Sequence, residues 1–95
     1  MVEVILSDFA IVDMQEIYDF IAKDSPHYAE KQIDKFIERI EILERYPLSG
    51  KVVPEYGIEN RRELVEGDYR IIYELFSERN ITILSIHHGA KLLHL

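Results

Sequence analysis

The spacing of hydrophobic residues changes several times along this chain, and each change marks the boundary of a predicted element. Residues 2–6, V-E-V-I-L, read as a first strand. Ser7 or Asp8 can then cap a helix, because a side-chain oxygen there accepts a hydrogen bond from a free amide of the first turn. The apolar residues that follow lie three and four positions apart, on one helical face: Ala10, Met14, Ile17, Tyr18 and Ile21. We expect this helix to end near Lys23 or Asp24.

A second helix is predicted over residues 26–45. Ser25 suits its N-cap and Pro26 its first position, where a missing amide costs nothing. The helix should stop before Pro47, because a proline disfavours helical geometry at the preceding residue. Its apolar stripe consists of Ala29, Ile33, Phe36, Ile37, Ile40 and Leu43. Since only Asp24 and Ser25 separate the two helices, they should form an antiparallel hairpin.

Residues 47–60 are expected to be the only long irregular segment, since two prolines and two glycines interrupt them. Three strands joined by tight turns are predicted after it, at 61–65, 69–76 and 80–87. In the middle strand, Arg70, Ile72, Glu74 and Phe76 share the face opposite Tyr69, Ile71, Tyr73 and Leu75. The order β-α-α-β-β-β predicts one α+β domain over residues 1–95, with an N-terminal helical hairpin packed on a small, mainly antiparallel twisted sheet.

Composition narrows the function. The chain has no cysteine, so disulfides and thiolate chemistry are excluded. Its net charge is −7, with 18 acidic residues against 11 Lys and Arg, which argues against a broad nucleic-acid surface. No apolar run is long enough to span a bilayer and the first residues do not resemble a signal peptide, so a cytoplasmic location is expected, without a membrane partner. The histidines show no metal-ligand spacing, and no cofactor is expected.

The segment 61–91 carries the candidate chemistry, because cations and aromatic residues interrupt its apolar positions. Neighbours in a strand point to opposite faces, so at most one of His87 and His88 can join any given site. Either could act as a general base near neutral pH, or could simply bond a carbonyl group near the strand end. Arg70 could likewise bind a ligand, or form a structural ion pair with Glu63 or Glu74.

Four motifs then occur in order: P-L-S-G at 47–50, R-E-L at 62–64, Y-R-I-I-Y at 69–73 and H-G-A-K at 88–91. Together they resemble the RelE/ParE superfamily of type II toxin–antitoxin toxins, and most closely its ParE-like, plasmid stabilisation branch. The resemblance covers nearly the whole chain. It implies two helices on a small twisted sheet and a small antitoxin that wraps the toxin. It also implies one of two modes of action: RelE-like members cut messenger RNA in the ribosome, whereas ParE-like members poison DNA gyrase.

The residues at the positions used by RelE-like nucleases depart from that pattern. Arg61 and Arg70 fall where two of the family's basic residues would lie, but Glu63 stands where the resemblance implies a lysine. A carboxylate there would repel the scissile phosphate. Lys91 supplies one cation after the last strand, but the usual arginine is absent. The tail Leu92-Leu93-His94-Leu95 also lacks the tyrosine that the resemblance implies.

We therefore expect a growth-inhibiting, ParE-like toxin that binds a protein target of the DNA gyrase class and is neutralised by a cognate antitoxin, rather than an enzyme. A RelE-like ribosome-dependent endoribonuclease and a decayed, non-toxic member remain alternatives. A homodimer or a toxin–antitoxin hetero-oligomer is the expected assembly. The nuclease alternative would use Arg61, Arg70 and His87. The expected binding residues are Arg62, Tyr73, His88, Lys91, Leu92 and Leu93.

Overall fold

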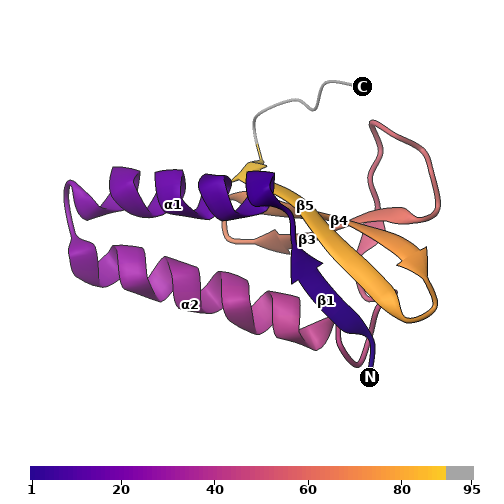
Figure 1. Cartoon of the computed structure of the whole chain (residues 1–95). Helices are drawn as coiled ribbons and strands as arrows, with labels where there is room; N and C mark the ends of the chain where they lie inside the picture. Colours follow the sequence, from indigo (N-terminus) through magenta and orange to yellow (C-terminus); the bar gives the residue numbers. More distant parts are fainter. Residues whose placement is uncertain (90–95) are drawn as a thin grey trace.

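A five-stranded sheet carries a two-helix hairpin on one of its faces in the computed structural model, which describes residues 1–89 (Figure 1). The elements follow in the order β1 (Glu3–Leu6), α1 (Asp8–Ala22), α2 (Pro26–Ile42), β2 (Lys51–Val52), β3 (Arg61–Glu66), β4 (Tyr69–Ser77) and β5 (Asn80–His88). The spatial order of the strands is β1-β5-β4-β3-β2. β1 runs parallel to β5 and all other pairs are antiparallel. The predicted α+β class and the helical hairpin are confirmed.

Both helices begin at the serines that the sequence indicated. The hydroxyl of Ser7 accepts from the amide of Ala10 at 3.0 Å, and that of Ser25 accepts from the amide of Tyr28 at 3.2 Å. The predicted end of α2 at residue 45 is wrong, because α2 ends at Ile42. Residues 43–45 continue as tighter turns, in which each amide bonds the carbonyl three residues earlier. This tightening turns the chain out of the helix before Pro47.

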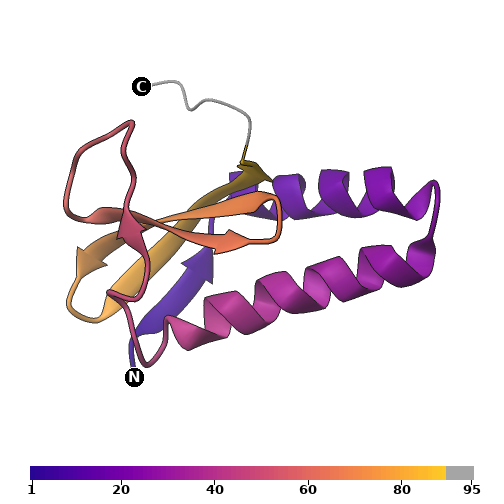
Figure 2. The same cartoon turned by 180° about the vertical axis from the view of Figure 1, so that it is seen from behind.

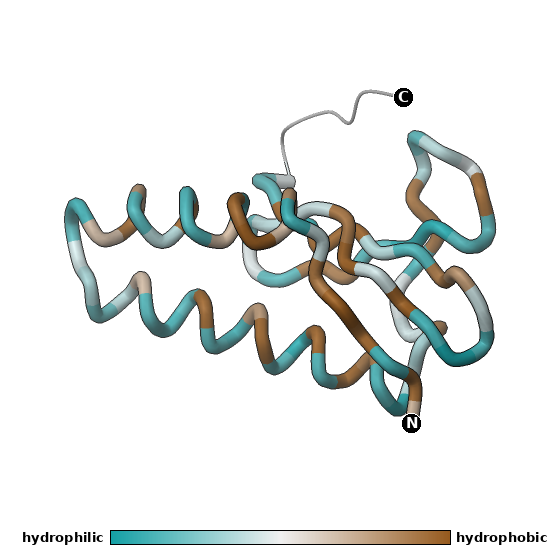
Figure 3. Tube along the Cα trace, in the orientation of Figure 1, coloured by the Kyte–Doolittle hydropathy of each residue, from teal (hydrophilic) through white to brown (hydrophobic). Residues whose placement is uncertain are grey.

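The core lies between the hairpin and one face of the sheet. Figure 3 shows β1 as largely hydrophobic and α2 as an alternation of hydrophobic and hydrophilic positions, as expected for a helix with one buried face. No helix within residues 1–89 is long and apolar enough to cross a membrane. The buried core side chains come from both layers: Ala10, Phe36, Ile40, Leu43, Leu64, Ile71, Tyr73, Ile81, Ile83 and Ile86.

The segment 47–60 is not wholly irregular, as the sequence had suggested, because it contains the short strand β2. Lys51 and Val52 pair with Glu63 and Arg62 of β3. The remainder, residues 53–60, leaves β2 and returns to β3 at the end of the sheet remote from the helical hairpin (Figure 2). The pairing was missed because a two-residue strand has no detectable period of its own.

Gly50 allows the chain to enter β2. Its amide donates to the hydroxyl of Tyr73 at 3.0 Å, and this hydroxyl donates to the carbonyl oxygen of Pro47 at 2.9 Å. A Cβ on Gly50 would lie 2.6 Å from the Tyr73 hydroxyl and 2.5 Å from the carbonyl oxygen of Glu63. Only glycine therefore fits, which gives the P-x-x-G motif a physical reason.

A β-bulge in β5 decides which residues face which side of the sheet. Ile72 pairs with Ser85 but Tyr73 pairs with Ile83, so Leu84 is an extra residue. Strict alternation from Ile83 would have turned His87 toward the helices. The extra residue shifts the alternation of faces by one position. Ile86 therefore points into the core, and His87 points to the opposite face of the sheet.

The start of α1 holds this bulge. The Ser7 hydroxyl donates to the carbonyl oxygen of Leu84 at 2.8 Å. The amide of Ile86 donates to the carboxylate of Asp13 at 2.9 Å. β1 pairs with β5 only as far as Ile83, so these two side chains bond the backbone of β5 beyond the point where the strand pairing ends.

Candidate functional site

The face of the sheet turned away from the helices carries all three predicted catalytic candidates, Arg61, Arg70 and His87. Alternation along β3 and β4 puts Arg61, Glu63, Arg70 and Glu74 on this side, and the bulge adds His87. We call these five residues the charged face. Cross-strand pairing places Arg61 directly opposite Glu74, and Arg70 directly opposite His87.

Arg70 is the most tightly held cation of the charged face. Its Nε donates to Glu63 at 2.7 Å, while its two Nη atoms donate to both carboxylate oxygens of Glu55 at 2.6 and 2.9 Å. The side chains of Arg70 and Glu63 are only 11% and 4% exposed. The hydrogen bond to Glu55 raises the pKa of Arg70, more than offsetting the opposing effect of burial. Arg70 is therefore permanently charged and enclosed by two carboxylates.

The other cations near the charged face also have acidic partners. Arg61 donates to Glu74 at 3.1 Å, and its guanidinium lies 4.6 Å from the ring centroid of Tyr56. The ammonium of Lys51 lies 3.5 Å from the buried carboxylate of Glu63. Arg61, Arg70 and Lys51 thus each contact a carboxylate within the described part of the chain, so the charged face is close to neutral.

The family model described as "ParE toxin of type II toxin-antitoxin system, parDE" matches residues 4–93. The chain belongs to the ParE toxin family. No curated protein matches its sequence significantly.

Two solved structures share the ParE-family fold of this chain. One, from the chromosomal ParDE toxin–antitoxin system of P. aeruginosa, is similar with a TM-score of 0.75 and 21% identity, over 93% of this chain and 96% of that chain. The other comes from a RelBE toxin–antitoxin complex of Mycobacterium tuberculosis, with a TM-score of 0.63 and 23% identity. That match covers 96% of this chain and 97% of the other. At these identities the two structures establish the fold alone.

His87 and His88, the two adjacent histidines at the end of β5, lie on opposite faces of the sheet, as the sequence predicted. His87 Nδ1 lies 3.2 Å from the carbonyl oxygen of His88, and its buried Nε2 has no hydrogen-bond partner among residues 1–89. The His88 ring packs edge-on against Tyr69, with 5.8 Å between centroids, on the helix side of the sheet. His87 is thus the histidine that joins Arg61 and Arg70.

Of the residues expected to bind a partner, the structure describes Arg62, Tyr73 and His88, which belong to β3, β4 and β5. Tyr73 is fully buried, where burial raises the pKa of its hydroxyl, so it can support a binding surface only from beneath. Arg62 is half-buried and donates to the carbonyl oxygens of Glu59 and Gly50, at 3.1 and 3.0 Å. Lys91, Leu92 and Leu93 lie outside the described residues. Their roles in binding stay predictions.

Sequence reasoning missed Glu55, the residue that closes the charged face. Glu55 is fifteen positions before Arg70 and follows Pro54 in a segment without periodicity. No local pattern could place it over β4. Arg70 pairs with Glu63, one of the two structural partners that the sequence allowed for it. Glu74, the other partner considered for Arg70, instead binds Arg61.

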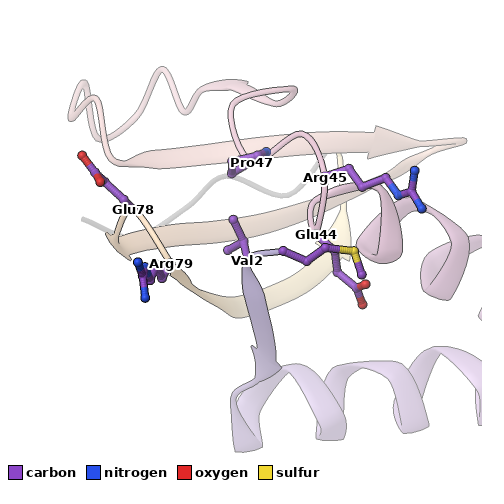
Figure 4. A pocket seen from close by; sticks show the side chains of 7 residues that line it. Val2, Glu44, Arg45, Pro47, Glu78 and Arg79 are labelled. Carbon is purple, nitrogen blue, oxygen red and sulfur yellow. The ribbon is translucent and has the colours of Figure 1, made fainter.

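Within residues 1–89, three of the concave regions lie outside the charged face. A groove of about 330 Å³ between the helices and β1 is lined by Leu6, Ile11, Met14, Gln15, Tyr18 and Ile33. The largest of these three, about 760 Å³, lies where β1 begins and α2 ends. Figure 4 shows Val2 and Pro47 at its centre, with Glu78 and Arg79 on one side and Glu44 and Arg45 on the other. A third pocket, of about 480 Å³, adjoins the largest at Pro47 and Glu78. No group of three potential metal ligands occurs within residues 1–89.

Proposed function

We propose that this chain is a cytoplasmic toxin that acts by binding a protein target of the DNA gyrase class, and that a cognate antitoxin neutralises it in a hetero-oligomer. Membership of the ParE family supports the toxin and antitoxin parts of the proposal. The choice of a protein target rests on one observation, which is the pairing of the cations on and beside the charged face with carboxylates.

That pairing disfavours chemistry on RNA. A ribonuclease of this size must hold the scissile phosphate with cations whose hydrogen-bond donors are free. Here Arg70 already donates to Glu63 and Glu55, so a phosphate would have to displace a bidentate carboxylate. The buried carboxylate of Glu63 would then lie close to the incoming phosphate and repel it. A binding role for this surface requires no such rearrangement.

The groove between the helices is the surface we assign to the antitoxin. Its lining is almost entirely apolar, and Ile11 at its rim is 54% exposed. An amphipathic helix can bury its apolar side in a groove of this kind. The two similar solved structures come from a toxin–antitoxin system and a toxin–antitoxin complex. We therefore expect an apolar antitoxin segment to lie along α1 and α2.

Purified gyrase tests the target. The chain, incubated with gyrase, ATP and relaxed plasmid, should inhibit supercoiling and trap cleaved plasmid bound to gyrase. Adding an excess of the antitoxin should restore supercoiling. Full gyrase activity at a large molar excess of folded toxin would contradict the proposed target.

A substitution in the groove tests the antitoxin assignment separately. Ile11→Lys should leave gyrase inhibition intact but reduce antitoxin affinity by about 10-fold or more, because a charge enters an apolar contact. Glu16→Lys, on the exposed part of α1 outside the groove, is the matched control and should bind the antitoxin normally. Equal affinity of the two variants would place the antitoxin elsewhere.

One observation supports the alternative that this chain is a RelE-like nuclease. Arg61, Arg70 and His87, the three candidates for catalysis, do lie on the same face of the sheet. Their shared location gives the RelE-like reading a geometric basis, although the carboxylates beside them oppose it.

A further inference from the structure

The third pocket lies at the end of the sheet where β4 passes into β5, and we call it the end pocket. Segments 47–48 and 59–60 form its walls, together with the last residues of β4. Its volume is about 480 Å³, within the range of sites that hold a bound side chain or small ligand. The residues that line it are Pro47, Leu48, Glu59, Asn60, Arg62, Leu75, Ser77 and Glu78.

Apolar side chains form part of the lining of the end pocket, namely those of Pro47, Leu48 and Leu75. Leu48 is 64% exposed and is therefore accessible to a partner. Large apolar side chains that gather around a concavity on a small domain typically mark an interaction site.

The charged residues that line the end pocket, Glu59, Glu78 and Arg62, give it a net negative charge. The carboxylates of Glu59 and Glu78 take part in no ion pair within residues 1–89. In Figure 4 the Glu78 carboxylate projects outward from the ribbon. Arg62 donates to two backbone carbonyl oxygens and contacts neither carboxylate. The lining therefore combines apolar side chains with two carboxylates and one guanidinium group.

We propose that the end pocket is a docking site for a basic segment of a protein partner. A bulky apolar side chain of the partner would enter the pocket and contact Leu48 and Leu75. A neighbouring lysine or arginine would lie against Glu59 or Glu78. This site shares no residue with the groove between the helices, so it can be occupied while that groove is filled.

Charge complementarity selects this occupant over the alternatives. A second copy of the chain would bring its own Glu59 and Glu78 to a symmetric contact, and both copies carry a net charge of −7. A nucleic acid would bring phosphates to the same carboxylates. A basic peptide segment gains from both the apolar side chains of the lining and the acidic rim.

A peptide titration tests the proposal on the full chain labelled with ¹⁵N. The probe is the blocked tripeptide acetyl-Lys-Phe-Lys-amide, compared with acetyl-Glu-Phe-Glu-amide. Lys-Phe-Lys should shift the amide signals of Leu48, Leu75 and Ser77 and bind about five times more tightly than Glu-Phe-Glu, because two rim ion pairs form. Shifts confined to α1 and α2, equal affinities for the two peptides, or no shift at millimolar peptide would each overturn the proposal.

Paired variants show whether the rim glutamates cause the preference. Glu59→Gln combined with Glu78→Gln should bring the two peptide affinities to within about twofold of each other. Glu30→Gln combined with Glu38→Gln, at exposed positions of α2, removes the same charge and should preserve the preference. Near-ultraviolet circular dichroism of both double variants is the control for folding, and their spectra should match that of the native chain. A preference that survives the first pair, or is lost in the second, would also overturn the proposal.

Discussion

At the scale of single residues, the partners of a side chain decide its chemistry more than its type does. Arg61 and Arg70 occupy positions where cations could bind phosphate, yet each donates to a carboxylate of the same chain. The sequence predicted that Arg70 could pair with Glu63. It could not predict Glu55, because the contact depends on how residues 53–60 fold back across the sheet.

Removing the Arg70 guanidinium should destabilise the protein strongly. Arg70→Ala leaves the carboxylate of Glu63 almost fully buried, and among residues 1–89 the cation that remains in contact with it is Lys51, at 3.5 Å. We expect the free energy of unfolding to fall by about 3 kcal/mol, measured by urea denaturation at neutral pH. Arg79→Ala, at an exposed position of the β4–β5 turn, is the control and should change it by less than about 0.5 kcal/mol. Similar midpoints for the two variants would mean that the ion pairs of Arg70 contribute little.

Tyr73 is the second residue whose partners define its role. Tyr73→Phe removes the hydroxyl that joins Pro47 to Gly50 and leaves the buried Gly50 amide unpaired. The expected loss of stability is about 1–3 kcal/mol by urea denaturation. Tyr46→Phe, at a tyrosine that is 64% exposed, should be nearly neutral.

The raised pKa of Tyr73 also predicts a pH dependence. Burial favours the neutral hydroxyl, so the folded state holds this proton more tightly than the unfolded chain, whose tyrosines titrate near pH 10. This contribution to stability is therefore complete below about pH 10 and declines as the pH rises toward the folded pKa. Unfolding curves from pH 8 to 11 should show a smaller alkaline loss for Tyr73→Phe than for the native chain. Parallel losses would contradict this assignment.

At the scale of elements, the β5 bulge shows what pattern reading could and could not supply. The helix starts, the hairpin and all three later strands were recognised from periodicity and caps. The bulge was not, because I-T-I-L-S-I at 81–86 is compatible with both unbroken and interrupted alternation. Only the packed structure selects Ile86 for the core, and this selection decides that His87 rather than His88 joins the charged face.

Asp13 should stabilise that bulge. Asp13→Ala removes the carboxylate that accepts from the Ile86 amide, while Asp13→Asn keeps an acceptor oxygen. We expect the alanine variant to lose about 1.5–3 kcal/mol of stability and the Ile86 amide to exchange much faster with solvent. The asparagine variant should lie between it and the native chain. Unchanged exchange at Ile86 in both variants would show that Asp13 does not hold the bulge.

At the scale of the whole molecule, an acidic body carries a nearly neutral charged face, an apolar groove and an acidic end pocket. The sequence predicted the family, the fold class and the lack of a broad cationic surface. The end pocket was not foreseen, because its walls come from three segments that meet only after the sheet has formed. The arrangement favours recognition of proteins, with apolar contact in the groove and basic complementarity at the end pocket.

The central claim is that this chain acts on a protein target and not on RNA. The most direct test induces the chain in cells without an antitoxin, maps the ends of messenger RNA and quantifies gyrase–DNA adducts in the same cultures. A surface with paired cations should leave messages intact, so we predict unchanged RNA ends, arrested growth and an increase in gyrase adducts. New cuts phased with codons inside translated messages, without an increase in adducts, would contradict the account.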